Sequence, residues 1–188
     1  MPPIPVFQYN STMSASPASS PYTEPWLRGT HGEIRAAGRA VVHALELALD
    51  DLRKWTAGLT PAEMQAAPFG LTPMNTQLRH IAGSIDRILT YAEGQRLTEE
   101  QLQRQRSEES GSESPSELIT AVEASIVGAF VRIRALAAQD LEQPRAVGRK
   151  QLPTSLGGAL VHVADHTQRH VGQVVVTAKV LKALRSGS

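Results

Sequence analysis

Apolar residues recur at steps of three and four positions in four long stretches of the chain, with polar residues between them. This spacing gathers the apolar side chains on one face of an α-helix and leaves the other face to water. The pattern predicts long helices over about residues 32–55, 72–94, 115–138 and 155–184. Four amphipathic helices of similar length predict an all-α fold, a four-helix bundle whose apolar faces meet along one axis.

The segments between the predicted helices contain capping and turn residues. Residues 95–114 are rich in Gln, Arg, Glu, Ser and Gly, and we interpret them as a solvated crossover without a binding role. Residues 139–154 form a second loop, and no part of the chain shows a useful strand pattern. Three capping boxes are expected: Thr60 with Glu63, Thr98 with Gln101, and Ser114 with Glu117.

The start of the chain differs from the rest. Residues 1–29 are rich in Pro and Ser and lack periodicity, so they are expected to form an N-terminal arm, and residues 30–188 the bundle domain. The arm contains the tripeptide Pro25-Trp26-Leu27. Because a Trp ring needs a place to be buried, this tripeptide is expected to anchor the end of the arm.

Composition narrows the classes of function. The formal net charge is +1, which gives no reason to expect a nucleic acid or an anionic membrane as a partner. The chain has no apolar run that could span a bilayer and no secretory signal pattern, so a cytoplasmic location is expected. Cysteine is absent, and any bound metal ion must therefore use His, Asp, Glu or water as ligands.

Three of the six histidines follow one another at four-residue steps in the last predicted helix: His162, His166 and His170. Residues four apart share a helix face, with Cβ atoms roughly 5–6 Å apart, so two such imidazoles can bind one ion. His162 and His170 are separated by about 12 Å of helix rise, too far to share it. Spacing alone leaves two pairs open, and His166 belongs to both.

A third ligand is expected from another helix, because two protein ligands rarely suffice. His80 is the best candidate, since it flanks the apolar face of the second helix next to Ile81. Three histidines with one open position define a metal site of the catalytic type. His31 and His43 have no histidine four residues away, and we interpret them as ordinary surface or core residues.

The helical histidine pair lacks the catalytic glutamate of zinc peptidases. Those enzymes use His-Glu-x-x-His, in which the Glu is the general base. In this chain Thr167 follows His166, and Asp165 points about 100° away from His166 on the helix. A peptidase of that type is therefore disfavoured.

Two segments resemble the DinB/YfiT-like family of metalloenzymes: residues 78–87, with the sequence LRHIAGSIDR, and residues 162–173, with the sequence HVADHTQRHVGQ. The resemblance covers about residues 31–185. It implies an up-down-down-up bundle with a long crossover between helices two and three. It also implies that His80, His166 and His170 hold a divalent ion, most commonly Zn or Ni, and that the protein is a homodimer.

The resemblance implies a metal-dependent enzyme that acts on a small molecule, by S-transfer with a bacillithiol- or mycothiol-like thiol or by hydrolysis. Arg79 or Arg87 is expected to hold an anionic part of the substrate, and Tyr91 or Asp86 to orient it. The alternative for these four residues is an ordinary helix surface. The alternative for the protein is a non-catalytic metal-binding, stress-related protein or a dimerisation module.

The second segment ends on Gly172 and Gln173, next to the expected ligand His170. Gln173 lies one turn beyond His170 and on the helix face of His166, so it is expected to support a ligand through a hydrogen bond or to line the pocket. Gly172 is interpreted as allowing close packing of the last helix.

Overall fold

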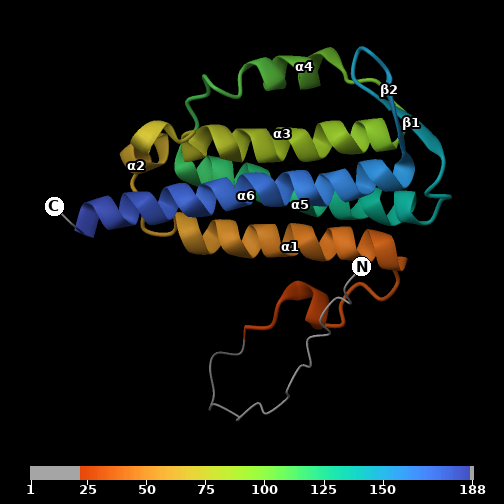
Figure 1. The fold of residues 1–188 in the computed structure, drawn as a ribbon, viewed down its shortest axis with the longest axis horizontal. Coiled ribbons are helices and arrows are strands. Elements are labelled where there is room, and N and C mark those ends of the chain that lie inside the picture. Colours follow the sequence, from red (N-terminus) through yellow and green to blue (C-terminus); the bar gives the residue numbers. More distant parts are fainter. Residues whose placement is uncertain (1–21, 187–188) are drawn as a thin grey trace, which may run out of the picture.

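The computed structural model describes residues 22–186, so the arm residues before Tyr22 lie outside the described part of the chain. The predicted all-α class is confirmed. The bundle consists of four long helices (Figure 1): α1 (Ala36–Thr56), α3 (Met74–Ala92), α5 (Pro115–Ala137) and α6 (Leu156–Ser186).

Shorter elements precede or connect these helices. They are η1 (Pro25–Leu27), α2 (Pro61–Gln65), η2 (Pro68–Gly70), α4 (Glu99–Arg106), β1 (Pro144–Val147) and β2 (Leu152–Ser155). None of the helices in residues 22–186 is long and apolar enough to cross a membrane.

The helix directions explain the long connection between α3 and α5. Figure 1 shows α1 and α6 running in one direction and α3 and α5 in the other. The ends of α1 and α6 lie together, where Arg185 donates to the carbonyl oxygen of Gly58 at 3.2 Å. Because α3 and α5 run the same way, the connection between them has to travel back along the outside of α3, and it carries α4.

The apolar faces of the four helices meet in one core. Leu45, Leu78, Ile85, Ile126 and Leu160 are almost completely buried and come from all four helices. Each fully buried Leu or Ile side chain stabilises the fold by roughly 1.5–3 kcal/mol relative to leaving it exposed. These residues lie on the faces that the three- and four-residue spacing predicts.

All three expected capping boxes are present. In each box the Thr or Ser side chain accepts a hydrogen bond from the backbone three residues on, and the Glu or Gln side chain accepts one from the capping residue's backbone. At the start of α5, for example, the amide of Glu117 donates to Ser114 Oγ at 3.3 Å. These caps fix the points at which α2, α4 and α5 begin.

Close packing between α1 and α5 occurs at Gly38, which was not predicted to be a packing residue. A Cβ added to Gly38 on α1 would clash with the Cβ of Ala137 on α5. A Cβ added to Gly172 would meet no atom within 4 Å, since Gly172 lies on the exposed side of α6. The interpretation of Gly172 as a packing residue is therefore wrong.

The loop before α6 contains a short hairpin that the sequence did not predict. Strands β1 and β2 pair antiparallel, with Pro144 opposite Ser155 and Val147 opposite Leu152. Each strand has only four residues and contains a proline, so no alternation of apolar and polar positions could be recognised.

The described end of the arm is anchored differently from the prediction. Trp26 is 62% exposed, and its indole nitrogen donates to Glu24 at 2.7 Å. Pro25 is the buried residue of η1, and Arg28 pairs with Asp50 of α1 at 2.8 Å. The expectation that Trp26 buries its ring is therefore wrong, because the indole N–H finds its partner at the surface.

Candidate metal centre

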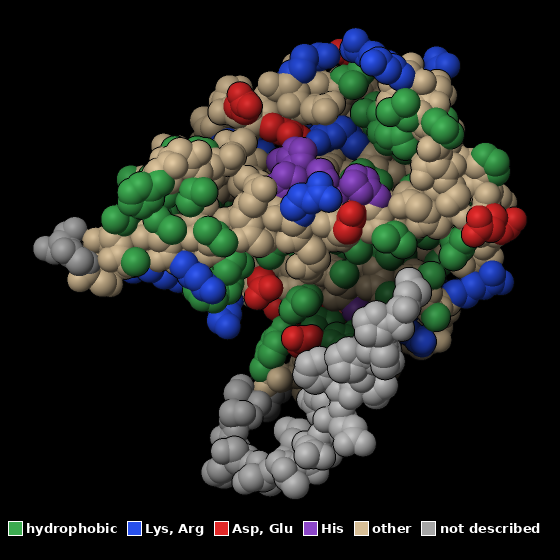
Figure 2. Space-filling model, viewed as in Figure 1, with side chains coloured by type: hydrophobic (Ala, Val, Ile, Leu, Met, Phe, Trp, Pro, Cys, Tyr) green, Lys and Arg blue, Asp and Glu red, His purple; other side chains and the backbone are tan. Residues whose placement is uncertain are grey.

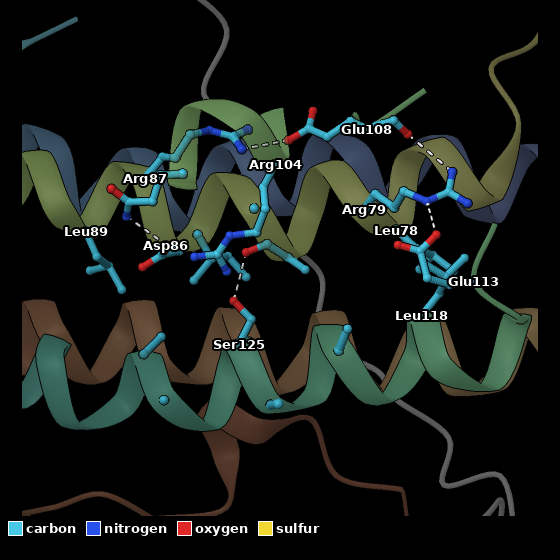
Figure 3. Close-up of a pocket in the computed structure, with 18 of the residues that line it drawn as sticks. Leu78, Arg79, Asp86, Arg87, Leu89, Arg104, Glu108, Glu113, Leu118 and Ser125 are labelled. Atoms are coloured by element: carbon cyan, nitrogen blue, oxygen red, sulfur yellow. Dashed lines mark hydrogen bonds and ion pairs between the residues drawn. The ribbon is translucent and has the colours of Figure 1, made fainter. Parts of the chain in front are cut away.

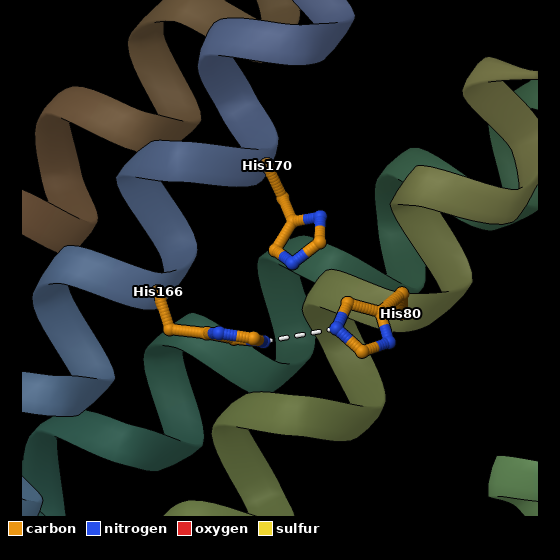
Figure 4. A group of neighbouring side chains, drawn as sticks. All are labelled: His80, His166 and His170. Carbon is orange, nitrogen blue, oxygen red and sulfur yellow. Dashed lines mark hydrogen bonds between the residues drawn. The ribbon is translucent and has the colours of Figure 1, made fainter. Parts of the chain in front are cut away.

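Three histidines from two antiparallel helices converge at the surface of the bundle. His80 lies on α3, and His166 and His170 lie one turn apart on α6 (Figure 4). One ring nitrogen from each lies within 4.8 Å of the other two. His80 Nε2 and His166 Nε2 are 2.9 Å apart, and the rings of His80 and His170 are 4.3 Å apart between centroids.

His162 does not belong to this group. Its Nδ1 pairs with Asp165 at 2.8 Å, and its side chain is 49% exposed. Its ring contacts that of His166, with the centroids 5.1 Å apart. Of the two helical pairs that spacing leaves open, the structure thus groups His166 and His170 with His80.

Hydrogen bonds fix how two of the rings face the centre. His80 Nδ1 lies 2.7 Å from Glu108 Oε2, and His170 Nδ1 lies 2.6 Å from Gln77 Oε1. A carboxylate and an amide oxygen only accept hydrogen bonds, so Nδ1 of both histidines carries the proton. Nε2 of His80 and of His170 then carries the lone pair that can bind a cation, which would replace the contact of His80 Nε2 with His166 Nε2.

The surroundings of the two α6 histidines favour their neutral forms. Burial, followed by the charges of His170 and His80, lowers the pKa of His166 to about 4. Burial and the charge of His80 also lower the pKa of His170. Histidine binds a metal ion through the lone pair of its neutral form. The three imidazoles could therefore hold a metal ion.

Glu108 links the crossover to the centre. Besides accepting from His80, it pairs through Oε1 with Arg87 Nη1 at 2.7 Å. Burial raises the pKa of Glu108, but the hydrogen bond with His80 and the charge of Arg87 outweigh burial and lower it. Glu108 is therefore an ionised acceptor that holds the His80 ring. Residues 95–114 were predicted to be a solvated crossover without a binding role, so the contact of Glu108 with His80 was not predicted.

Gln77 is a second residue of the site that was not predicted from the sequence. It is buried, accepts from His170, and donates to Gln173 Oε1. Its position one turn before His80 on the same helix face was a usable signal. No local pattern could have identified Glu108, because its position depends on the path of the crossover.

The centre opens into a polar pocket of about 490 Å³. Figure 2 shows histidine side chains at the surface in a hollow of this face of the molecule. The pocket is lined by Thr72, Thr76, Gln77, His80, Gln105, Arg106, Glu108, Glu109, His170 and Gln173. It therefore includes two of the three converging histidines and the predicted Gln173.

The arginines proposed for substrate binding lie on another side of α3. The Arg79 side chain is 9% exposed, and it donates to Glu113 at 2.9 Å and to the Gly111 carbonyl at 2.6 Å. Arg79 and Arg87 line a second cavity of about 630 Å³ between α3, α4 and α5 (Figure 3). Both guanidinium groups thus contact the crossover, and neither arginine lines the histidine pocket.

The other two candidates lie further along α3. Asp86 accepts from Gln101 at 2.8 Å and pairs with Arg132 at 2.8 Å, so it joins α3 to α4 and α5. Tyr91 lies in the last turn of α3, about 16 Å of helix rise from His80. The structure does not bring either residue to the three histidines.

Fold and centre together define a class of protein, helical bundles with a three-histidine site between two antiparallel helices. The family model of the DinB superfamily matches residues 44–174, a range that contains His80, His166 and His170. The chain belongs to the DinB superfamily, as the resemblance predicted. None of the curated proteins compared with the chain matches it.

Proposed function

We propose that the protein is a metal-dependent enzyme that acts on a small molecule at His80, His166 and His170. One observation carries the proposal: ring nitrogens of three histidines converge beside a pocket of about 490 Å³. Zn or Ni is the proposed ion, because three imidazoles and one open position suit these metals in catalytic sites. A divalent ion there supplies Lewis acidity, which makes a bound water or thiol nucleophilic near neutral pH.

The protein's own residues position the reactants. Glu108 and Gln77 hold the rings of His80 and His170 through their Nδ1 protons. Gln173 lines the pocket and orients Gln77. Arg106 lies at the pocket with an exposed side chain that pairs with Glu99 at 2.6 Å, and it is the proposed partner for an anionic part of the substrate.

We propose S-transfer with a low-molecular-weight thiol as the reaction, with hydrolysis as the alternative at the same centre. In either reaction the nucleophile has to lose a proton. Glu109 is an exposed carboxylate of the same pocket and is the proposed acceptor of that proton.

The test combines metal content with activity. Protein purified without chelators should contain Zn or Ni, and His166→Ala should lose one metal ion per chain. His162→Ala is the matched control, because it removes a neighbouring imidazole of the same helix and should keep the ion. Unchanged metal content in His166→Ala would refute the centre.

Activity is then measured with bacillithiol, mycothiol and glutathione against a chromogenic electrophile. Turnover that is present in the wild type and in His162→Ala, and absent in His166→Ala, supports the enzyme. An intact metal site without turnover of any thiol or ester substrate would favour a non-catalytic metal-binding protein.

A further inference from the structure

A second cluster of metal-binding side chains lies on α1, apart from the centre between α3 and α6. It comprises His31, in the loop before α1, and His43 and Glu46, one turn apart on α1. One donor atom of each lies within 4.8 Å of the other two. His31 Nε2 is 2.8 Å from Glu46 Oε1, and the two histidine rings are 5.7 Å apart between centroids.

Burial makes this cluster unusual for a protein surface. His43 is only 7% exposed, and its Nε2 lies 3.2 Å from Thr30 Oγ1. Glu46 uses one carboxylate oxygen for His31, while the other, Oε2, is buried without a hydrogen-bond partner. A buried carboxylate oxygen without a partner costs free energy, and a cation beside it would remove that cost.

The backbone at His31 is also strained. Its φ is 58°, in the left-handed region that only a few per cent of non-glycine residues adopt, with Asn, Asp and His over-represented among them. Such strain costs on the order of 1–3 kcal/mol and persists where the surroundings enforce it. Here it directs the imidazole toward α1, where the ring meets Glu46 and packs edge-on against Phe130 of α5.

We propose that His31, His43 and Glu46 form a second site for a divalent transition-metal ion. Two imidazoles and one carboxylate are a donor set that Zn, Fe and Mn accept. With bonds of about 2.0–2.2 Å, Zn would replace the hydrogen bond between His31 Nε2 and Glu46 Oε1, and small shifts of the three donor atoms, which lie within 4.8 Å of one another, would complete the site. The ion fastens the segment before α1 to the bundle, and the apolar Phe130 ring shields it on one side.

Two of the three residues lie outside the range that the family model matches, and Glu46 lies just inside it. The DinB superfamily match begins at residue 44, so His31 and His43 both precede it. The site is also independent of the proposed function, because it shares no residue with the centre at His80, His166 and His170.

The experiment counts Zn²⁺ ions per chain by titration calorimetry and elemental analysis of metal-free protein reloaded with zinc chloride. The wild type is expected to bind two ions and Glu46→Gln one. Glu46→Gln preserves the shape of the side chain and its acceptor for His31. His31→Ala is a second test that removes a loop residue outside the core, and circular dichroism confirms that each variant is folded.

The variants separate this proposal from the proposed function. His166→Ala should lose the ion between α3 and α6 and keep the one on α1, whereas Glu46→Gln should do the reverse. His162→Ala should keep both ions. One ion in the wild type that disappears entirely in His166→Ala would overturn the second site, and so would two ions in both Glu46→Gln and His31→Ala.

Discussion

Glu108, in the crossover between α3 and α5, connects that segment to the candidate metal centre through one side chain. It contacts His80 at 2.7 Å through one oxygen and Arg87 at 2.7 Å through the other. The histidines themselves could be predicted, because four-residue spacing on a helix and the family resemblance are both local properties of the sequence. Glu108 could not, since nothing in residues 95–114 indicates which of several glutamates faces α3.

At this scale we predict that Glu108→Ala weakens Zn²⁺ binding by about 10–100-fold, the usual effect of removing the acceptor behind a metal-bound histidine. Glu108→Gln should lose less, because its amide oxygen can still accept from His80 Nδ1. Competition with a chromogenic chelator measures the affinity. Glu100→Gln is the control, an exposed carboxylate of the same crossover. Equal affinity in Glu108→Ala and the control would contradict the assigned role.

Among the helices, those with a clear capping signal were predicted most accurately. The boxes at Thr60, Thr98 and Ser114 combine two side chains at fixed spacing, so the sequence specifies them completely. The hairpin of β1 and β2 has no comparable signal. Its pairing depends on where α5 and α6 place the ends of a short loop, which is a tertiary property.

The cap at the start of α5 yields a stability prediction. Ser114→Ala removes the acceptor for the Glu117 amide and should lower the free energy of unfolding by about 1 kcal/mol. Urea denaturation followed by circular dichroism measures the change. Thr120→Ala is the control, because it removes an exposed hydroxyl from the interior of the same helix and should be neutral or slightly stabilising. Similar losses in both variants would contradict the capping role.

Substitution by Ala should change the stability of the protein in opposite directions at two helical glycines. Gly172→Ala adds a methyl group in open space and should stabilise the protein by roughly 0.5–1 kcal/mol. Gly38→Ala forces α1 away from Ala137 of α5. This change should destabilise the protein by about 1–3 kcal/mol. Thermal unfolding of the two variants side by side checks the prediction. A stabilised Gly38→Ala would show that the two helices separate easily.

For the whole molecule, the core and the metal centre are built from different residues. Leu, Ile, Val and Ala from all four long helices form the core, whereas His80, His166 and His170 are only partly buried at its edge. Sequence periodicity predicted the core well, because burial of a continuous helix face depends on spacing. We therefore expect the fold to form without an ion, unlike small zinc domains, which unfold when metal is removed.

Removal of metal should accordingly lower the stability of the protein without changing its fold. At a free zinc concentration 100 times the dissociation constant, each site adds about 2.7 kcal/mol, or roughly 5–11 °C in Tm for a chain of this size. Chelation should reverse that gain while the far-UV circular dichroism at 25 °C stays unchanged. His162→Ala should show the full shift in Tm and His166→Ala a smaller one. Loss of helical signal on chelation would mean that the ions hold the bundle together, which its continuous apolar core argues against.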